Sequence, residues 1–165
     1  MYRGEIEINA DNRKLLVEFE TTLSVDRSLS KNTLAAYRSD IYKLIAFTEG
    51  KNLKKISSEE ISAFIQELYD VHLSGRSIAR IVSGLKSFYK HLIIEGELEA
   101  NPMQFILTPK LPKKLPEVLS HSEISEMIAA IDLSKIAGER DKTIMMLMYG
   151  CGLRVSELTG LKINN

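Results

Sequence analysis

The stretch SGRSIARIVSGLKSFYKHLIIEG, residues 74–96, shows most clearly how this chain folds. Its apolar residues recur at helical spacing and gather on one side of a wheel drawn at about 100° per residue. Ser74 or Ser77 is a suitable N-cap, and Gly96 is a suitable stop. The opposite side is small and basic, so a nucleic-acid backbone could come close to it. That side is made of Arg76, Arg80, Ser83, Ser87 and Lys90.

Three helices are predicted before this stretch. Residues 9–25 carry apolar residues at helical spacing. Ser30 is a suitable N-cap for a second helix, which runs to Thr48 and stops at Gly50. The sequence SSEE at residues 57–60 is a capping box that opens a third helix. The second helix also has a small basic face, with Lys31 and Lys43 on it and Arg38 at its edge.

A proline-rich segment follows the fourth helix. Proline disfavours helix in itself and in the residue before it. We therefore expect an extended, basic linker, and we place it over residues 101–119, after a helical domain over 1–100 and before a second domain over 120–165. The residues that define the linker are Pro102, Pro109, Lys110, Pro112, Lys113, Lys114 and Pro116.

The residues after the linker also read as helices. A second capping box, SHSE at residues 120–123, opens one helix, and another is expected from about Glu139 to Tyr149. The run IMMLM at residues 144–148 is apolar all round, so it should be buried. Glycines at 150 and 152 break this helix, and a short one follows over residues 155–161. No strand pattern stands out, and the predicted fold class is all-α.

Composition bounds the possible functions. The 165 residues are 44% hydrophobic and 27% charged, which is ordinary for a globular protein. The start lacks the apolar core of a signal peptide, and no apolar run is long enough to span a bilayer. A single cysteine fits a reducing cytoplasm. The scattered histidines give no metal-ligand spacing, and no Gly-rich phosphate loop is present. We therefore expect no metal, no cofactor and no membrane partner.

The two basic helix faces and the basic linker suggest a nucleic-acid surface. Phosphate contacts from Lys and Arg supply most nonspecific affinity for DNA. The alternative is that these faces are simply solvated, as most charged stripes are. Net charge is zero at pH 7, which argues against a nonspecific polycation and leaves a local basic face open.

Arg154 lies in the glycine-flanked stretch YGCGLRVSEL, residues 149–158. One interpretation is structural, with Arg154 tying a turn to Glu157. The other is an anion clamp, because a guanidinium matches a phosphate and the following helix N-terminus adds partial positive charge. In the second case Glu157 would hold the guanidinium in place.

These residues together resemble the N-terminal part of a tyrosine site-specific recombinase of the phage-integrase family, of the Xer type. Residues 30–40 and 77–89 resemble the second and fourth helices of that family's SAM-like core-binding domain. Residues 109–116 resemble its linker. The most specific match is at 140–142 and 149–158, which resemble the region of the family's first catalytic arginine. The resemblance spans nearly the whole chain.

The resemblance implies that Arg154 binds the scissile phosphate with Glu157 as its support. It implies that the helical domain grips duplex DNA through its second and fourth helices, and that both domains clamp around the DNA. In this family a tyrosine attacks the phosphodiester and forms a 3′-phosphotyrosine link, with no metal or cofactor. The implied partners are double-stranded DNA and other recombinase subunits, in a tetrameric synapse when the protein is full-length. The predicted DNA-contacting residues are Lys31, Arg38, Lys43, Arg76, Arg80, Lys90, Lys110, Lys113 and Lys114.

The sequence departs from the family pattern after Arg154. Residues 155–165 contain no tyrosine, histidine or second arginine, and Lys162 comes too soon to be the family's hairpin lysine. We therefore expect a truncated catalytic domain, and a chain that binds DNA without cleaving it. About fifty residues make a poor independent core. We expect the run at 144–148 to pack against a second copy, as a homodimer, or against the N-terminal domain.

Two alternatives stay open. One is a non-enzymatic DNA-binding regulator, in which residues 156–161 form part of a helix-turn-helix. The other is a helical protein-interaction module, which predicts no binding to any duplex even at low salt. The sequence does not name a target site, and chromosome resolution, phage integration and transposon movement all remain open.

Overall fold

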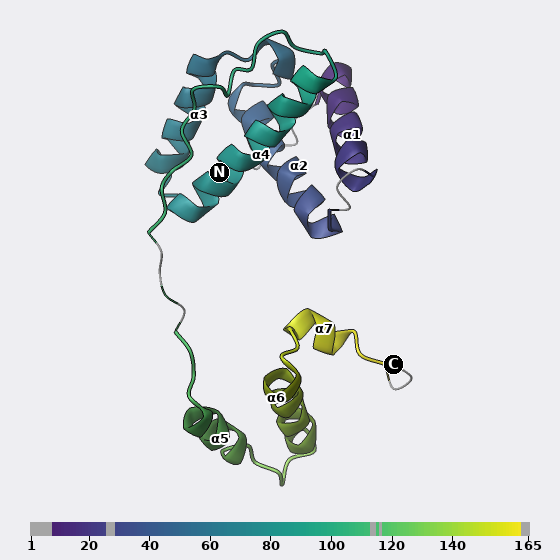
Figure 1. Cartoon of the computed structure of the whole chain (residues 1–165), viewed down its shortest axis with the longest axis vertical. Coiled ribbons are helices and arrows are strands. Elements are labelled where there is room, and N and C mark those ends of the chain that lie inside the picture. Colours follow the sequence, from purple (N-terminus) through teal and green to yellow (C-terminus); the bar gives the residue numbers. More distant parts are fainter. Residues whose placement is uncertain (1–7, 26–28, 113–114, 116, 163–165) are drawn as a thin grey trace. The chain divides into compact units, whose positions relative to one another are not determined.

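The computed structural model describes residues 8–25, 29–112, 115 and 117–162, and every regular element within them is helical. The all-α prediction is therefore confirmed. The chain divides into two compact units, Met1–Lys113 (unit 1) and Lys114–Asn165 (unit 2). The elements, drawn in Figure 1, are α1 (Ala10–Val25), α2 (Lys31–Phe47), the 3-10 helix η1 (Leu53–Lys55), α3 (Ser58–Asp70), α4 (Gly75–Ile94), α5 (His121–Ala129), α6 (Gly138–Cys151) and α7 (Val155–Thr159).

The helices of unit 1 begin at the capping residues that the sequence indicated. The Ser30 hydroxyl accepts a hydrogen bond from the Thr33 amide at 3.2 Å. At α3 the box is reciprocal, because Ser57 accepts from the Glu60 amide while Glu60 accepts from the Ser57 amide at 2.9 Å. Of the two candidate caps for α4, Ser74 is the one used. Each cap satisfies amides that the first turn leaves unpaired.

Unit 1 has one apolar core, and α4 passes through it, packing against both α2 and α3. Tyr89 of α4 is fully buried, and its hydroxyl donates to the Leu53 carbonyl at 3.1 Å. Burial raises the pKa of Tyr89, so the hydroxyl stays a neutral donor. The other large side chains that are fully buried are Phe19, Ile41, Leu44, Ile45, Leu53, Ile61, Phe64, Ile78, Ile81, Leu85 and Phe88.

Asn12 fixes the start of α1 to the connection between α2 and α3. Its side chain is fully buried; the amide donates to the Lys51 carbonyl at 2.9 Å, and the oxygen accepts from the Leu53 amide at 2.8 Å. Asn9 adds a bond to the Gly50 carbonyl at 2.9 Å. These bonds satisfy backbone groups of residues 50–53, before and within η1, an element that the sequence analysis missed.

The segment after α4 runs back along the α3 and α4 side of unit 1 (Figure 1). Met103 is buried in the core, and the Pro102 carbonyl accepts from the Ser58 hydroxyl at 2.8 Å. Further on, Lys86 donates to the Thr108 hydroxyl at 3.3 Å. The first part of the predicted linker thus packs on unit 1. The predicted domain bounds at 100 and 119 stay a prediction.

Unit 2 holds α5, α6 and α7. The predicted capping box at α5 is confirmed, since the Ser120 amide donates to Glu123 at 2.7 Å and Ser120 accepts from the Glu123 amide at 3.3 Å. Gly152 ends α6 in the left-handed region at φ 66°, where glycine is favoured. α6 is slightly longer than expected, and α7 ends at Thr159 rather than at residue 161.

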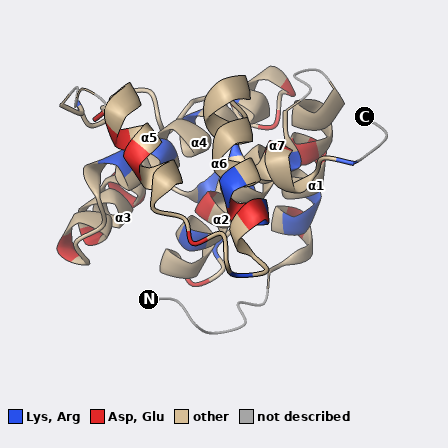
Figure 2. Ribbon diagram, turned by 90° about the horizontal axis from the view of Figure 1, so that it is seen from below, with Lys and Arg blue, Asp and Glu red and all other residues tan. Residues whose placement is uncertain are grey.

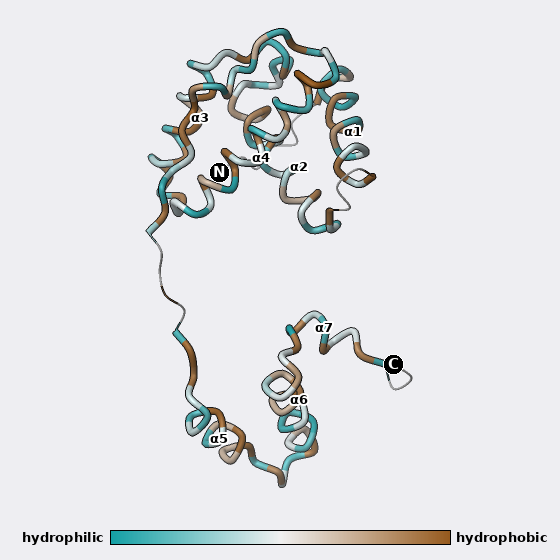
Figure 3. Tube along the Cα trace, in the orientation of Figure 1, coloured by the Kyte–Doolittle hydropathy of each residue, from teal (hydrophilic) through white to brown (hydrophobic). Residues whose placement is uncertain are grey.

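Residues 144–148 are not buried within unit 2, and their predicted packing against a second copy or against the N-terminal domain stays a prediction. Met146 is 54% exposed, its apolar neighbours are only half-buried, and Gly138 is the one buried residue among those described in unit 2. Hydrophobic residues recur along α5 and α6 in Figure 3. Three short helices have too little surface to enclose this much apolar side chain. No described helix is long and apolar enough to cross a membrane.

Candidate DNA interface

The predicted DNA-contacting residues of unit 1 lie mainly on α2 and α4, which cross in close contact because of Gly84. A Cβ placed at Gly84 would lie 3.2 Å from the Tyr37 ring and 3.5 Å from Asp40 Oδ2. An alanine there would require the Tyr37 ring to shift by a few tenths of an ångström, so the two helices are closely packed at this point. Gly84 thus lies at a close contact between the two helices, beside Tyr37 and Asp40.

Asp40 is the centre of a charged cluster between these helices. Its side chain is fully buried, Oδ2 receives Arg80 Nη1 at 2.5 Å, and Oδ1 receives Lys43 Nζ at 3.1 Å. The side chains of Arg80 and Lys43 remain 45% and 31% exposed. Two of the predicted DNA-contacting cations are thus brought together by a carboxylate that the sequence analysis did not assign to the site. The available signal was its spacing of three residues from Lys43 on the same helix.

Arg38 is engaged differently. Both its Nε and its Nη2 donate to the two carboxylate oxygens of Glu20 on α1, in a bidentate pair. This hydrogen bonding raises the pKa of Arg38, with burial opposing it. Glu20 was also missed, because it lies eighteen residues away in sequence and only tertiary packing brings it close. One edge of the Arg38 guanidinium is therefore occupied before any ligand arrives.

The remaining predicted contacts are less constrained. Lys31, Arg76, Lys90 and Lys110 are exposed, and none of them forms an ion pair within the residues that the structure describes. Lys113 and Lys114 lie outside the described residues. Figure 2 shows Lys and Arg interspersed with Asp and Glu along the helices, so charge of both signs must be considered at this surface.

Arg154 follows the glycine break that ends α6 and forms the N-cap position of α7. Its amide donates to Glu157 Oε2 at 2.8 Å, and its Nη1 donates to Glu157 Oε1 at 3.1 Å. The backbone bond, followed by the side-chain bond, lowers the pKa of Glu157. The Arg154 side chain is nevertheless 82% exposed. The predicted tie to Glu157 exists, and the remaining donors of the guanidinium face solvent beside a helix N-terminus.

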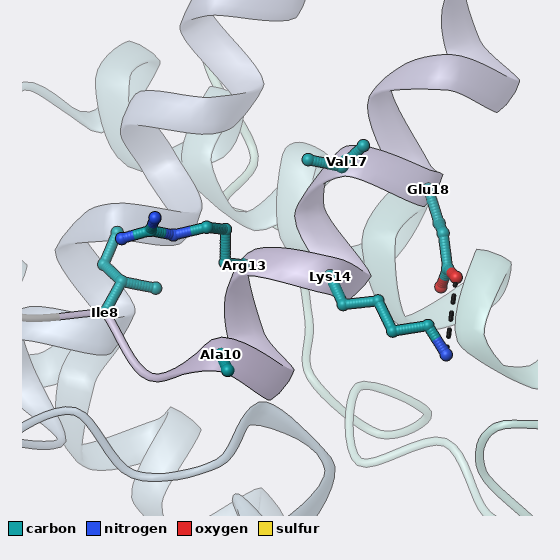
Figure 4. Close-up of a pocket in the computed structure, with 6 residues that line it drawn as sticks. All are labelled: Ile8, Ala10, Arg13, Lys14, Val17 and Glu18. Carbon is teal, nitrogen blue, oxygen red and sulfur yellow. Dashed lines mark ion pairs between the residues drawn. The ribbon is translucent and has the colours of Figure 1, made fainter.

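The hollows lined by described residues are open to solvent rather than enclosed. One of about 580 Å³ lies on the outer face of α1 (Figure 4), lined by Ile8, Ala10, Arg13, Lys14, Val17 and Glu18. Its lining comes from α1 and from Ile8, two residues before that helix, and Lys14 and Glu18 form an ion pair there at 3.7 Å. No cluster with metal-ligand chemistry occurs among the described residues. The basic helix surface and Arg154 are therefore the features with recognisable chemistry.

Comparisons with known proteins address both units. A sequence model described as "Phage integrase, N-terminal SAM-like domain" matches residues 16–96. A second, described as "Phage integrase family", matches residues 117–165. The first lies within unit 1 and the second within unit 2.

Individual relatives agree with these matches. Tyrosine recombinase XerD of Proteus mirabilis is 33% identical over 157 residues, which cover 94% of this chain and 50% of that protein. Tyrosine recombinase XerC of Bacillus subtilis (strain 168) is 34% identical over 155 residues, covering 92% and 50%. The integrase from mycobacterium phage Brujita matches the fold with a TM-score of 0.59 at 23% identity, covering 90% and 49%. The chain spans about half the length of the curated relatives it matches, and it belongs to the phage integrase family of tyrosine recombinases.

Proposed function

We propose that this chain is the DNA-binding part of a site-specific recombinase, or integrase, that cuts and rejoins duplex DNA through a 3′-phosphotyrosine intermediate. The observation that carries this proposal is the family match of both units, to the SAM-like domain and to the integrase family. The chemistry of the surface agrees with it, because the predicted contacts are cations on two neighbouring helices. Double-stranded DNA is the proposed ligand, and the cytoplasm is the proposed compartment.

In unit 1, α2 and α4 would meet the DNA backbone. Arg80 and Lys43 come from different helices and are held by one buried carboxylate, so they would contact phosphates as a preset pair. Arg76 and Lys90 would add contacts from the two ends of α4. Each cation that neutralises a phosphate releases a condensed counterion, which makes the affinity fall steeply with salt.

In unit 2, Arg154 would bind the scissile phosphate. A guanidinium offers a rigid set of donors to the phosphate oxygens, and the N-terminus of α7 favours an anion at the same place. Glu157 would act as a positioning residue, because it holds both the amide and the Nη1 of Arg154. A donor set fixed in this way would stabilise the charge that develops as the phosphodiester is attacked.

We expect this chain to bind duplex DNA without cleaving it. Residues 155–165 supply no tyrosine nucleophile, no histidine and no second arginine to act with Arg154. The regulator alternative that placed a helix-turn-helix at 156–161 has little support, because α7 is only 5 residues long. Such a helix rises about 8 Å, too short to read a groove on its own.

The test measures duplex binding and cleavage separately. Fluorescence anisotropy with a labelled duplex of mixed sequence, over a salt series, should show binding whose affinity falls linearly on a log–log plot. A nicked suicide duplex carrying a family target site should yield no covalent protein–DNA adduct. Absence of binding at the lowest salt would reject the DNA-binding proposal and favour the protein-interaction module. A covalent adduct would reject the claim that the chain cannot cleave.

The proposed protein partners are other recombinase subunits, in a tetrameric synapse for a full-length protein. For this chain we propose a weak homodimer that covers apolar residues of α6, which are exposed or half-buried in unit 2. Light scattering over a concentration series should show the mass rising toward that of a dimer. A constant monomer mass up to the highest soluble concentration would remove the homodimer.

A further inference from the structure

We propose that Asp40 is a positioning residue for DNA binding, which sets Arg80 of α4 and Lys43 of α2 as one phosphate-contacting pair. This inference rests on the proposed DNA-binding function and adds to it a residue that cannot touch DNA itself. Asp40 is an acid within a surface proposed to meet a polyanion. From its charge alone, Asp40 should therefore weaken DNA binding. Its contacts with Arg80 and Lys43 indicate instead that it favours DNA binding.

The carboxylate is used completely by the two cations. Asp40 is fully buried, with one oxygen receiving Arg80 and the other receiving Lys43. Among the described residues, every buried side-chain nitrogen and oxygen has a hydrogen-bond partner. Both oxygens of Asp40 are therefore satisfied within the protein. A buried charge is tolerated only when it is paired and hydrogen-bonded. The two ion pairs therefore fix the positions of the Arg80 and Lys43 head groups at the protein surface.

Arg80 and Lys43 each form one hydrogen bond to Asp40, and their other N–H groups stay available to a phosphate. Only Nη1 of Arg80 contacts Asp40, and the side chain is 45% exposed, so the other N–H groups of the fork can face a phosphate. Lys43 Nζ similarly has one bond to Asp40 and a side chain that is 31% exposed. Immobilising a long side chain before binding removes part of the entropy cost that binding would otherwise carry.

The position of the cluster depends on the helix crossing. Gly84 is the point of close approach, and a Cβ there would meet both the Tyr37 ring and Asp40 Oδ2. Asp40 therefore lies close to Gly84, with one cation from each helix bonded to it. Because the Asp40 carboxylate bonds one cation from each helix, the distance between α2 and α4 sets the distance between the charges of Arg80 and Lys43.

Glu20 supplies the contrast within the same unit. It takes both Nε and Nη2 of Arg38, so it occupies the edge with which that guanidinium would grip a phosphate. Removing the negative charge of Glu20 should free Arg38 and strengthen DNA binding. Removing the charge of Asp40 should instead let Arg80 and Lys43 lose their fixed positions. Two substitutions that change net charge identically are thus expected to act in opposite directions.

The experiment compares Asp40→Asn with Glu20→Gln, using anisotropy with a short duplex of mixed sequence over a salt series. We expect Asp40→Asn to weaken binding about tenfold and to lower the slope of log affinity against log salt by about one. We expect Glu20→Gln to bind more tightly than the original chain. Circular dichroism melts establish the temperature at which all variants are folded, and binding is measured below it.

A background variant separates positioning from general disturbance. In Arg80→Ala/Lys43→Ala protein, Asp40→Asn should change the affinity by less than about twofold, because both cations through which Asp40 acts are gone. An undiminished effect in that background would assign Asp40 a merely structural role. Asp40→Asn protein that binds as tightly as the original chain, or more tightly, would overturn the inference outright.

A further variant covers the case in which Asp40→Asn does not fold. Arg80→Lys keeps the positive charge but replaces the planar guanidinium, with its several fixed N–H donors, by a single ammonium group. It should weaken DNA binding about fivefold. Unchanged affinity would contradict the importance of a fixed guanidinium. If the unaltered chain binds no duplex at low salt, the proposed function fails and this inference fails with it; if the chain binds and only Asp40 behaves otherwise, the function stands.

Discussion

Cations of equal charge on α2 and α4 differ in what holds them. Arg80 is fixed by a buried carboxylate, Arg38 is gripped through two nitrogens by Glu20, and Arg76 has no ion pair within the described parts of the chain. A free arginine loses rotamer freedom when it binds a phosphate, whereas a fixed one has already lost much of it. Position, rather than charge alone, should therefore rank these residues.

The first prediction compares Arg80→Ala with Arg76→Ala. Both should lower the salt slope by about one, because each removes one phosphate contact. Arg80→Ala should cost more affinity, since the side chain that is lost is already held in position before binding and no longer acts together with Lys43. It should also destabilise unit 1 by about 1–3 kcal/mol, because a buried carboxylate oxygen is left unsatisfied.

The measurements are duplex anisotropy and urea unfolding. Lys14→Ala is the control, because Lys14 lies on α1 in an exposed pair with Glu18 at 3.7 Å, away from α2 and α4. Equal losses of affinity for Arg80→Ala and Lys14→Ala would show that binding follows total charge and not this surface.

A second prediction concerns the pH range over which Glu157 holds Arg154. The pKa of Glu157 is lowered below its ordinary value of 4.5, so the tie contributes fully above that pH and is lost as pH falls through the lowered pKa. The backbone amide is the largest cause and the side chain the second. Arg154→Ala keeps the amide, so the largest cause of the lowered pKa should remain.

Carbon-detected NMR titration of the Glu157 carboxyl group checks this. A pKa that returns to the ordinary value in Arg154→Ala protein would mean that the guanidinium, and not the amide, holds the carboxylate. A pKa that stays low would separate the structural role of Glu157 from its proposed support of the phosphate clamp.

At the level of single residues, the sequence predicted what local spacing determines. The caps at Ser30, Ser57 and Ser120 follow from a side chain reaching an amide three residues away, and all were predicted. Asp40 and Glu20 were not, because their partners on α4 and α2 are brought to them only by packing. The predicted roles of Arg154 and of the DNA-contacting cations remain predictions.

At the level of elements, the helices were predictable because each has an apolar period and a boundary signal. The 3-10 helix η1 was missed because it is 3 residues long and is held by the side chain of Asn12 and the hydroxyl of Tyr89. The path of residues 101–111 was missed for a similar reason. Prolines predict an extended chain, but only the contacts of Met103 and Thr108 decide that it lies on unit 1.

The third prediction tests the junction between α5 and α6 with two glycine substitutions. A Cβ at Gly138 would collide with the Asp132 carbonyl oxygen and lie 2.9 Å from the Leu133 Cα, so Gly138→Ala must displace backbone. A Cβ at Gly150, within α6, meets nothing within 4 Å, so Gly150→Ala should favour the helix by up to about 1 kcal/mol.

Far-UV circular dichroism and amide NMR report on both variants. We expect Gly138→Ala to lose helical signal and to shift the resonances of 130–141, while Gly150→Ala gains signal. Similar spectra for the two variants would contradict the tight turn at Gly138.

Across the whole chain, the two units differ in how they bury apolar surface. Among the described residues, unit 1 encloses a core of twenty hydrophobic side chains, whereas no hydrophobic side chain described in unit 2 is fully enclosed. The sequence predicted apolar stripes in both units and expected the α6 run to be buried. A hydrophobic pattern specifies which face should be covered, but it does not specify whether enough other residues exist nearby to cover it.

The last prediction is that the two units unfold independently and with very different stability. Amides in α4 should exchange with solvent only through global unfolding of unit 1, because the helix lies in its core. Amides in α5 and α6 should exchange about a hundredfold faster or more, because few buried contacts oppose local opening.

Hydrogen exchange followed by mass spectrometry, at low and high protein concentration, measures both quantities at once. If a second copy covers α6, protection over 138–151 should rise with concentration while that of α4 stays constant, because only an intermolecular contact depends on mass action. Protection of α6 equal to that of α4 at low concentration would contradict the independence of the units. Protection that stays low at every concentration would show that α6 remains uncovered, so that the apolar run at 144–148 keeps its exposure and the homodimer does not form.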